Sequence, residues 1–184
     1  MKRGIILKFE LLERIKFPYD DIGGYVDANL LINHEGKKFA KKRASIRHFE
    51  ESFPRWQYEE IVGSNIDLAF DTEKRWQGVN LVTDDEKQFI LSVFRRLHDN
   101  NEQNLFGGIL TDGKNSLGYS VTAQLDDVTA VILIMRAVKE VSGLNSVLYR
   151  ETARALTQQV PQLERIYLGV GGSSVDIQNR NSYL

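Results

Sequence analysis

The stretch Gly107-Gly108-Ile109-Leu110-Thr111-Asp112-Gly113-Lys114-Asn115-Ser116-Leu117-Gly118-Tyr119-Ser120-Val121-Thr122 lies in the middle of this 184-residue chain. Asp112-Gly113 is a dipeptide typical of a tight turn, and residues of high β-propensity lie on both sides of it. We therefore predict a β-hairpin over residues 107–122. A hairpin among helices favours an α+β fold over a regularly alternating parallel α/β fold.

Two helices are predicted on either side of this hairpin. The first covers about residues 84–98, because Thr83-Asp84-Asp85-Glu86 matches a capping box and the apolar residues after it share one face. The second covers about residues 127–142 and ends at Gly143. Its run Val131–Met135 is apolar all round, which predicts that this helix is the central one.

The C-terminal part of the chain predicts a third helix and a late strand. The helix covers about residues 146–160, begins at Ser146 and stops at Pro161. The strand covers residues 163–170, and a short polar tail follows from about residue 173.

The N-terminal half predicts antiparallel strands. Residues 25–33 and 66–70 alternate between apolar and polar side chains. Residues 4–12 alternate loosely and suggest an opening strand, but a helix is the alternative there, because Ile5, Ile6, Phe9 and Leu12 also share a helical face. Residues 39–53 are ambiguous: they fit a strand that returns from a turn at 34–37, which we favour, or a helix. The fold class predicted is therefore α+β, as a single globular domain over residues 1–184, with antiparallel hairpins in the N-terminal half and about three helices.

The composition is that of an ordinary globular protein, but its charge is unevenly distributed. Lys and Arg exceed Asp and Glu by 11 to 6 in residues 1–47, a net charge of +5, whereas residues 48–140 hold 9 against 16, a net of −7. Such asymmetry indicates a charged partner. The chain has no cysteine, which excludes disulfides and thiolate metal sites and agrees with a cytoplasmic protein. No apolar run approaches the roughly 20 residues of a membrane span.

The sequence offers no set of residues that is typical of a known chemistry. Its histidines, His34, His48 and His98, do not have the spacing of a zinc site. The glycines at 169–172 follow a predicted strand, but no Gly-Lys-Ser/Thr accompanies them. We therefore expect no metal, no cofactor and no catalytic residues.

The acidic segment suggests a partner-binding surface. Aromatic residues can anchor an interface, and carboxylates can steer a basic partner toward it. The leading hypothesis is a non-enzymatic inhibitor, such as an immunity protein that neutralises a basic toxin, for example a nuclease, by occluding its active site. The predicted partner-binding residues are Glu50, Glu51, Trp56, Tyr58, Glu59, Glu60, Asp67, Asp71 and Glu73.

The basic segment supports an alternative, a nucleic-acid-binding module. Clustered cations attract a phosphate backbone. The residues concerned are Lys37, Lys38, Lys41, Lys42, Arg43 and Arg47. Two further alternatives stay open: a small enzyme whose site assembles only in three dimensions, and an oligomer subunit that uses Val131–Met135 as an interface.

Overall fold

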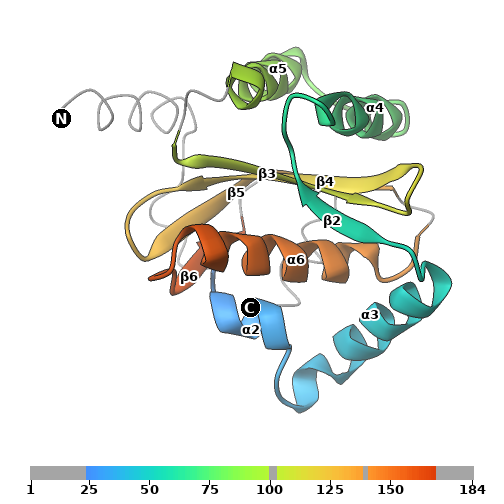
Figure 1. The fold of residues 1–184 in the computed structure, drawn as a ribbon, viewed down its shortest axis with the longest axis vertical. Helices are drawn as coiled ribbons and strands as arrows, with labels where there is room; N and C mark the ends of the chain where they lie inside the picture. Colours follow the sequence, from blue (N-terminus) through green and yellow to red (C-terminus); the bar gives the residue numbers. More distant parts are fainter. Residues whose placement is uncertain (1–23, 100–102, 139–140, 169–184) are drawn as a thin grey trace.

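A computed structural model of the protein describes residues 24–99, 103–138 and 141–168. It has a mixed α/β fold built on one six-stranded sheet (Figure 1). The strands are β1 (Tyr25–Asp27), β2 (Gln57–Glu60), β3 (Leu105–Thr111), β4 (Ser116–Gln124), β5 (Thr129–Ala137) and β6 (Arg165–Tyr167). Their order across the sheet is β1-β6-β5-β4-β3-β2, and only the β5–β6 pair is parallel.

Helices cover both faces of this sheet. They are α2 (Ala28–Asn33), α3 (Ala40–Ser52), α4 (Ile66–Gln77), α5 (Asp84–Asp99) and α6 (Leu144–Gln159), and a short 3₁₀ helix, η1 (Lys37–Phe39), precedes α3. Helices α4 and α5 lie on one face, whereas α6 lies on the other, with α2 and α3 beyond it (Figure 1). The sheet is thus larger, and the helices more numerous, than the sequence predicted.

The central hairpin and two of the three predicted helices are confirmed. Strands β3 and β4 pair antiparallel through the turn at Asp112–Asn115. Helix α5 begins after Thr83, whose Oγ1 accepts a hydrogen bond from the Glu86 N–H at 3.2 Å. Helix α6 matches the prediction for 146–160, although its N-cap is Gly143 rather than Ser146. Strand β6 confirms the late strand in a shorter form.

The predicted helix at 127–142 is wrong, because those residues form the central strand β5. Side chains of a strand point alternately to its two faces, and β5 is covered on both. Ala130 and Ile132 pack on the α6 side, while Val131 and Ile134 pack on the α4 and α5 side. A strand buried on both faces is apolar throughout, which periodicity alone does not distinguish from a buried helix.

Two N-terminal strand predictions are also wrong, and a third is confirmed only in part. Only residues 25–27 of the segment 25–33 form a strand, because the Asp27 carboxylate caps α2 by accepting from the Leu30 N–H at 3.1 Å. Residues 40–52 adopt the helical alternative, and residues 66–77 form α4. The predicted strand at 4–12 and the polar tail lie outside the described residues.

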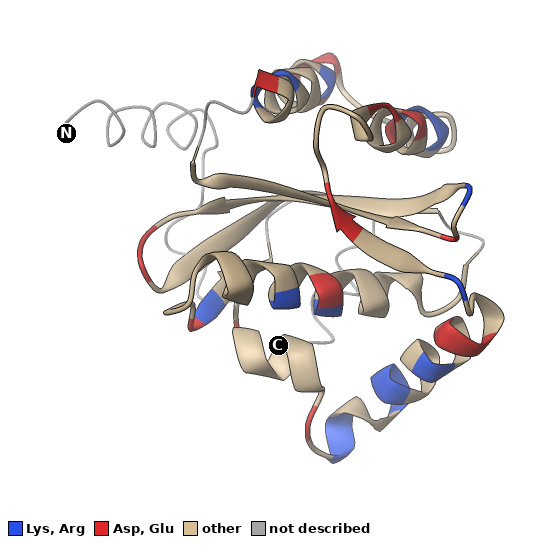
Figure 2. Ribbon diagram, in the orientation of Figure 1, with Lys and Arg blue, Asp and Glu red and all other residues tan. Residues whose placement is uncertain are grey.

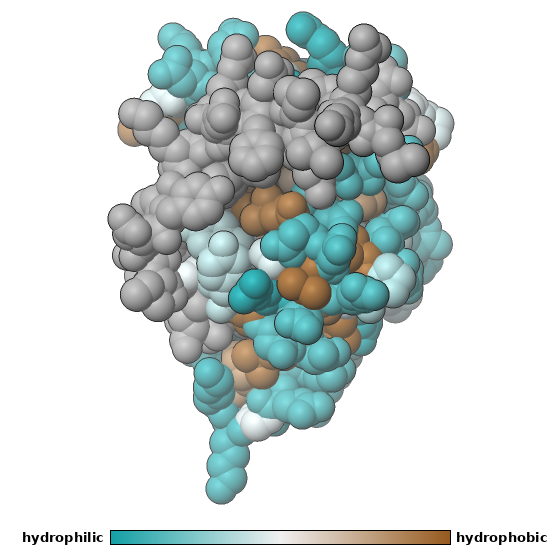
Figure 3. All heavy atoms as spheres, turned by 90° about the vertical axis from the view of Figure 1, so that its left-hand side faces the viewer, coloured by the Kyte–Doolittle hydropathy of each residue, from teal (hydrophilic) through white to brown (hydrophobic). Residues whose placement is uncertain are grey.

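The described surface shows no large apolar area on the side seen in Figure 3. Its residues there are mainly hydrophilic, and the apolar patches are small and separated (Figure 3). Among the described helices, none is long and apolar enough to cross a lipid bilayer.

Candidate functional site

The structure divides the predicted acidic residues between the two faces of the sheet. Glu50 and Glu51 lie on α3, whereas Asp67, Asp71 and Glu73 lie on α4 across the sheet (Figures 1 and 2). Glu59 and Glu60 are exposed on the edge strand β2, with Trp56 just before it. The nine residues are therefore not gathered on one surface.

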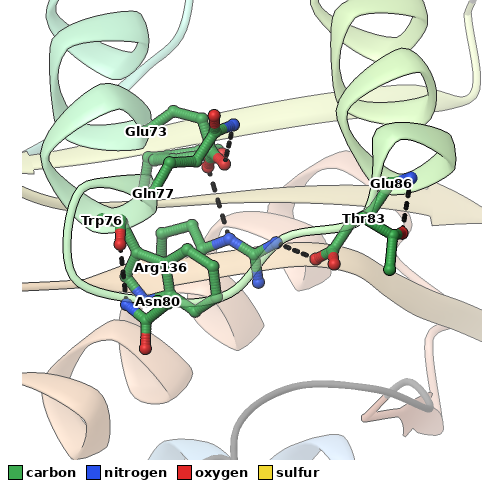
Figure 4. A network of polar contacts seen from close by, with 8 residues as sticks. Glu73, Trp76, Gln77, Asn80, Thr83, Glu86 and Arg136 are labelled. Carbon is green, nitrogen blue, oxygen red and sulfur yellow. Dashed lines mark hydrogen bonds and ion pairs between the residues drawn. The ribbon is translucent and has the colours of Figure 1, made fainter.

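Glu73 is a structural residue rather than a surface carboxylate. It is buried, accepts hydrogen bonds from the Tyr119 hydroxyl and from Gln77 Nε2 at 2.8 Å, and pairs with Arg136 (Figure 4). The capping residue Glu86 also pairs with Arg136, at 2.6 Å, instead of reaching back to Thr83. This network joins α4 and α5 to the sheet.

The basic residues predicted to bind nucleic acid lie on η1 and α3. Figure 2 shows their positive charge along α3, on the far side of α6 from the sheet. Five of the six are exposed, and Lys42 is half-buried. Burial lowers the pKa of Lys42, and the charge of Lys41 lowers it further. The structure leaves nucleic-acid binding as a prediction.

A pocket between α6 and strands β2, β3 and β4 brings together three hydroxyl groups. We call it the tyrosine pocket and define it by Tyr58, Ser120 and Thr152, which line it. Ser120 Oγ lies 2.8 Å from Thr152 Oγ1, and Tyr58 Oη lies 3.1 Å from the first and 3.3 Å from the second. The pocket has a volume of about 190 Å³, enough for a substituent of a substrate but below the range typical of a drug-sized ligand.

The tyrosine pocket depends on a glycine in the neighbouring strand. A Cβ atom on Gly108 would lie 1.9 Å from Tyr58 Oη, so only glycine allows the tyrosine ring to rest on β3. A glycine inside a strand marks a close approach of this kind, and it is the one sequence signal that could have indicated the pocket. Ser120 and Thr152 carried no such signal.

The electrostatic character of the tyrosine pocket is weakly acidic. Among the described residues that line it, Glu60 alone is charged, and Gln158 and Gln159 add neutral polar groups. Burial raises the pKa of Tyr58, so its phenol is protonated at neutral pH. The pocket therefore offers hydroxyl donors and one carboxylate, a combination that suits a ligand with an ammonium group and a carbonyl oxygen.

Metal chemistry has no support from the described residues. Within residues 24–99, 103–138 and 141–168, no three His, Asp or Glu side chains are close enough together to hold a metal ion.

Comparisons with known proteins identify related sequences and folds. A model of the family described as phosphatidylglycerol lysyltransferase, C-terminal, matches residues 23–170. Among solved structures, a conserved Bacteroides thetaiotaomicron protein of unknown function aligns with a TM-score of 0.74 and 22% identity, covering 87% of this chain and 54% of that one. No curated protein matches the chain.

Two further solved structures also align with this chain. L-PGS from Bacillus licheniformis aligns with a TM-score of 0.58 and 12% identity, over 87% of this chain and 55% of that one. The C-terminal domain of a putative lysylphosphatidylglycerol synthetase from Agrobacterium fabrum aligns with a TM-score of 0.52 and 16% identity, over 79% and 45%. At these identities the likeness concerns the fold alone. The chain spans about half the length of these structures.

The comparisons contradict the hypothesis of an inhibitor or immunity protein. The matched family is named for a transferase, and its model covers all of the described residues. The acidic residues do not form the single docking surface that the hypothesis requires. They are divided among a buried network, an edge strand and the surfaces of two helices. The prediction of a partner with a basic surface stays a prediction.

Proposed function

Because this chain belongs to the phosphatidylglycerol lysyltransferase C-terminal family, we propose that it takes part in transferring an aminoacyl group to a hydroxyl of a phospholipid head group. The observation that carries this proposal is the family match over residues 23–170, which includes every described strand and helix. The tyrosine pocket is the site we assign to the aminoacyl group.

The reaction is an acyl transfer between two oxygen atoms. The acceptor hydroxyl oxygen attacks the carbonyl carbon of an activated lysyl ester and forms a new ester bond. The bond from that carbon to the donor oxygen breaks, and the acceptor's proton passes to the released oxygen. Hydrogen-bond donors at the carbonyl oxygen stabilise the negative charge that develops there. Protonated Tyr58 is suited to this role in the tyrosine pocket.

The negative charge of the tyrosine pocket favours binding of the aminoacyl group there over binding of the lipid phosphate. A lysyl ester is cationic, and Glu60 attracts it. Glu60 would repel a phosphate, and the described residues that line the pocket include no Lys or Arg.

Binding of a lysyl ester tests the pocket directly. Lysine methyl ester is titrated into the protein and followed by NMR, with norleucine methyl ester, which lacks the side-chain ammonium, as the matched ligand. We expect lysine ester to bind more tightly and Glu60→Gln to weaken it about threefold, as for an exposed ion pair. Glu59→Gln is the control, because adjacent strand residues point to opposite faces. Equal binding of the two esters would contradict the assignment.

Transfer is tested with phosphatidylglycerol vesicles and an isotope-labelled activated lysyl ester. Mass spectrometry detects any lysyl ester of the lipid. We expect product with the intact pocket and a loss of at least about tenfold in rate for Tyr58→Phe, which removes one donor. Absence of a lysyl ester of phosphatidylglycerol in this assay would overturn the proposed function.

A further inference from the structure

A second hollow lies across α6 from the tyrosine pocket. We call it the arginine groove; it has a volume of about 480 Å³ and is lined by residues at the end of α2 and on α3 and α6. Its four arginines are Arg43 and Arg47 from α3 and Arg150 and Arg154 from α6. Residues more than 100 positions apart in the chain thus present guanidinium groups to one space.

Carboxylates neutralise only part of this charge. Arg150 Nη2 lies 2.8 Å from Glu50 Oε1, and Arg150 Nε lies 2.6 Å from Glu151 Oε1. Arg154 Nη1 also contacts Glu151 Oε1, at 2.9 Å. Four arginines against these two carboxylates leave two positive charges. Arg43 and Arg47 form no ion pair with any residue that the structure describes.

Contacts within the protein hold two of the guanidinium groups in position at the groove. Arg43 Nη1 donates to the backbone carbonyls of His34 at 2.5 Å and Gly36 at 2.9 Å, which fixes its guanidinium at the edge of the groove. Arg150 is buried, and its guanidinium lies 5.8 Å from the centre of the Trp56 ring. Guanidinium groups positioned in advance lose little entropy when they bind an anion.

The positive charge of the groove acts on His34, which is one of its lining residues. His34 is buried, and its pKa is lowered from 6.5 to about 4, first by burial and then by Arg150, Lys42, Arg43 and Arg154. Positive charge therefore accumulates around His34.

We propose that the arginine groove binds a phosphate group, carried either by a lipid head group or by a soluble phosphate ester. Guanidinium groups match the geometry of phosphate oxygens and bind them through paired hydrogen bonds. Arg150 and its two carboxylate partners are enough to link α3 to α6. A purely structural role for the arginines therefore does not explain why Arg47 also lines the groove. The site is separate from the tyrosine pocket and does not depend on the proposed transfer.

A single phosphate group fits the groove better than a nucleic-acid strand does. The strand would follow a continuous basic track. Lys37, Lys38 and Lys41 do not line the groove, and Glu50 does.

The test compares two charge-removing substitutions on the same helix. Arg47→Gln removes an arginine that lines the groove, and Lys41→Gln removes an exposed cation of α3 outside the lining. Inorganic phosphate and glycerol 1-phosphate are titrated at constant ionic strength, and binding is followed by calorimetry. We expect Arg47→Gln to raise Kd at least about tenfold, the loss typical of one charged hydrogen bond, and Lys41→Gln to leave it within twofold.

A local readout separates groove binding from general charge attraction. Bound phosphate raises the pKa of His34, which NMR detects as a pH-dependent shift of its imidazole signals. Equal effects of the two substitutions, or no response of His34, would overturn the proposal.

The source of the phosphate is distinguished by a third arm with phosphatidylglycerol vesicles. Vesicle binding that is lost in Arg47→Gln and kept in Lys41→Gln supports a lipid head group, whereas binding of glycerol 1-phosphate without vesicles supports a soluble ester. RNA binding that both substitutions weaken equally would replace the proposal with the nucleic-acid prediction. Lysine ester binding in the tyrosine pocket is expected to be unaffected in each case, so the two proposals fail separately.

Discussion

Glu73 on α4 and Arg136 on β5 form a buried ion pair, although 63 residues separate them in the chain. Arg136 Nε lies 3.3 Å from Glu73 Oε2, and the two side chains are only 8% and 3% exposed. The Arg136 guanidinium also stacks 3.8 Å from the centre of the Trp76 ring. A buried charge costs several kcal/mol unless it is paired, so Glu73 requires Arg136, and Arg136 requires its carboxylate partners Glu73 and Glu86.

Glu73→Ala is therefore expected to destabilise the protein by about 3–5 kcal/mol, because it leaves Arg136 inside with one carboxylate partner fewer. Asp71→Ala on the same helix breaks only the exposed pair with Lys74 and is expected to cost less than about 0.5 kcal/mol. Urea unfolding of both variants measures the difference. A loss below 1 kcal/mol for Glu73→Ala would contradict the role of the pair.

Local signals in the sequence predicted elements whose stability is local. The capping residue Thr83 and the turn at Asp112-Gly113 act over a few residues, and both lie where they were predicted. The strand β5 depends instead on neighbours distant in the chain. Its apolar run Ala130–Met135 became a strand because β4 and β6 pair with it and helices cover both of its faces.

Helix α4 is a second element that the periodicity of the sequence did not predict correctly. Ile66, Leu68 and Phe70 alternate as in a strand, but burial follows a helical spacing through Ile66, Ala69 and Trp76. Three residues are too few to decide between the two periods.

The candidate sites were less predictable than the fold, because each combines distant segments. Tyr58 was singled out for its aromatic ring beside acids, yet its partners Ser120 and Thr152 come from β4 and α6. Arg43 and Arg47 were recognised as basic, but Arg150 joins them only through the packing of α3 on α6. Composition identified several of the residues, and topology determined what they form.

The contact between Gly108 and Tyr58 predicts a strong coupling between these two positions. Gly108→Ala is expected to cost about 2 kcal/mol or more, because its methyl group would lie 1.9 Å from Tyr58 Oη. In a Tyr58→Ala background the ring that the methyl group would meet is absent, and the same change is expected to cost much less. Denaturant unfolding of the two single variants and the double variant gives the coupling, expected at about 1–3 kcal/mol. Additive effects would show that the ring does not rest on Gly108.

Gly143 fixes the approach of α3 to the start of α6. Its φ is +81°, and a Cβ atom there would lie 2.2 Å from the Ser45 carbonyl oxygen. Gly113 in the hairpin turn has a similar φ of +92°, but a Cβ atom would meet nothing closer than 3.9 Å. Alanine at Gly113 is expected to cost about 1 kcal/mol for the backbone conformation alone. Gly143→Ala is expected to cost at least about 2 kcal/mol more, measured as the difference in unfolding free energy. Equal losses would mean that backbone conformation, rather than the contact with α3, accounts for the cost.

The depressed pKa of His34 predicts a loss of stability in mild acid. The unfolded histidine takes up a proton near pH 6.5, whereas the folded one, buried among Arg150, Lys42, Arg43 and Arg154, does so only near pH 4. Between these values the unfolded state binds more protons, so the stabilising contribution is complete above pH 6.5 and falls as the pH drops toward 4. Solvent screening of the arginines reduces the expected loss to about 2 kcal/mol. His34→Asn is the control, since asparagine tolerates the left-handed backbone at φ +50° and does not titrate. We expect the unfolding free energy of the wild-type protein to fall by about 2 kcal/mol more than that of the variant between pH 7 and pH 4. Parallel pH profiles would show that burial and the neighbouring cations do not hold His34 neutral in the folded protein.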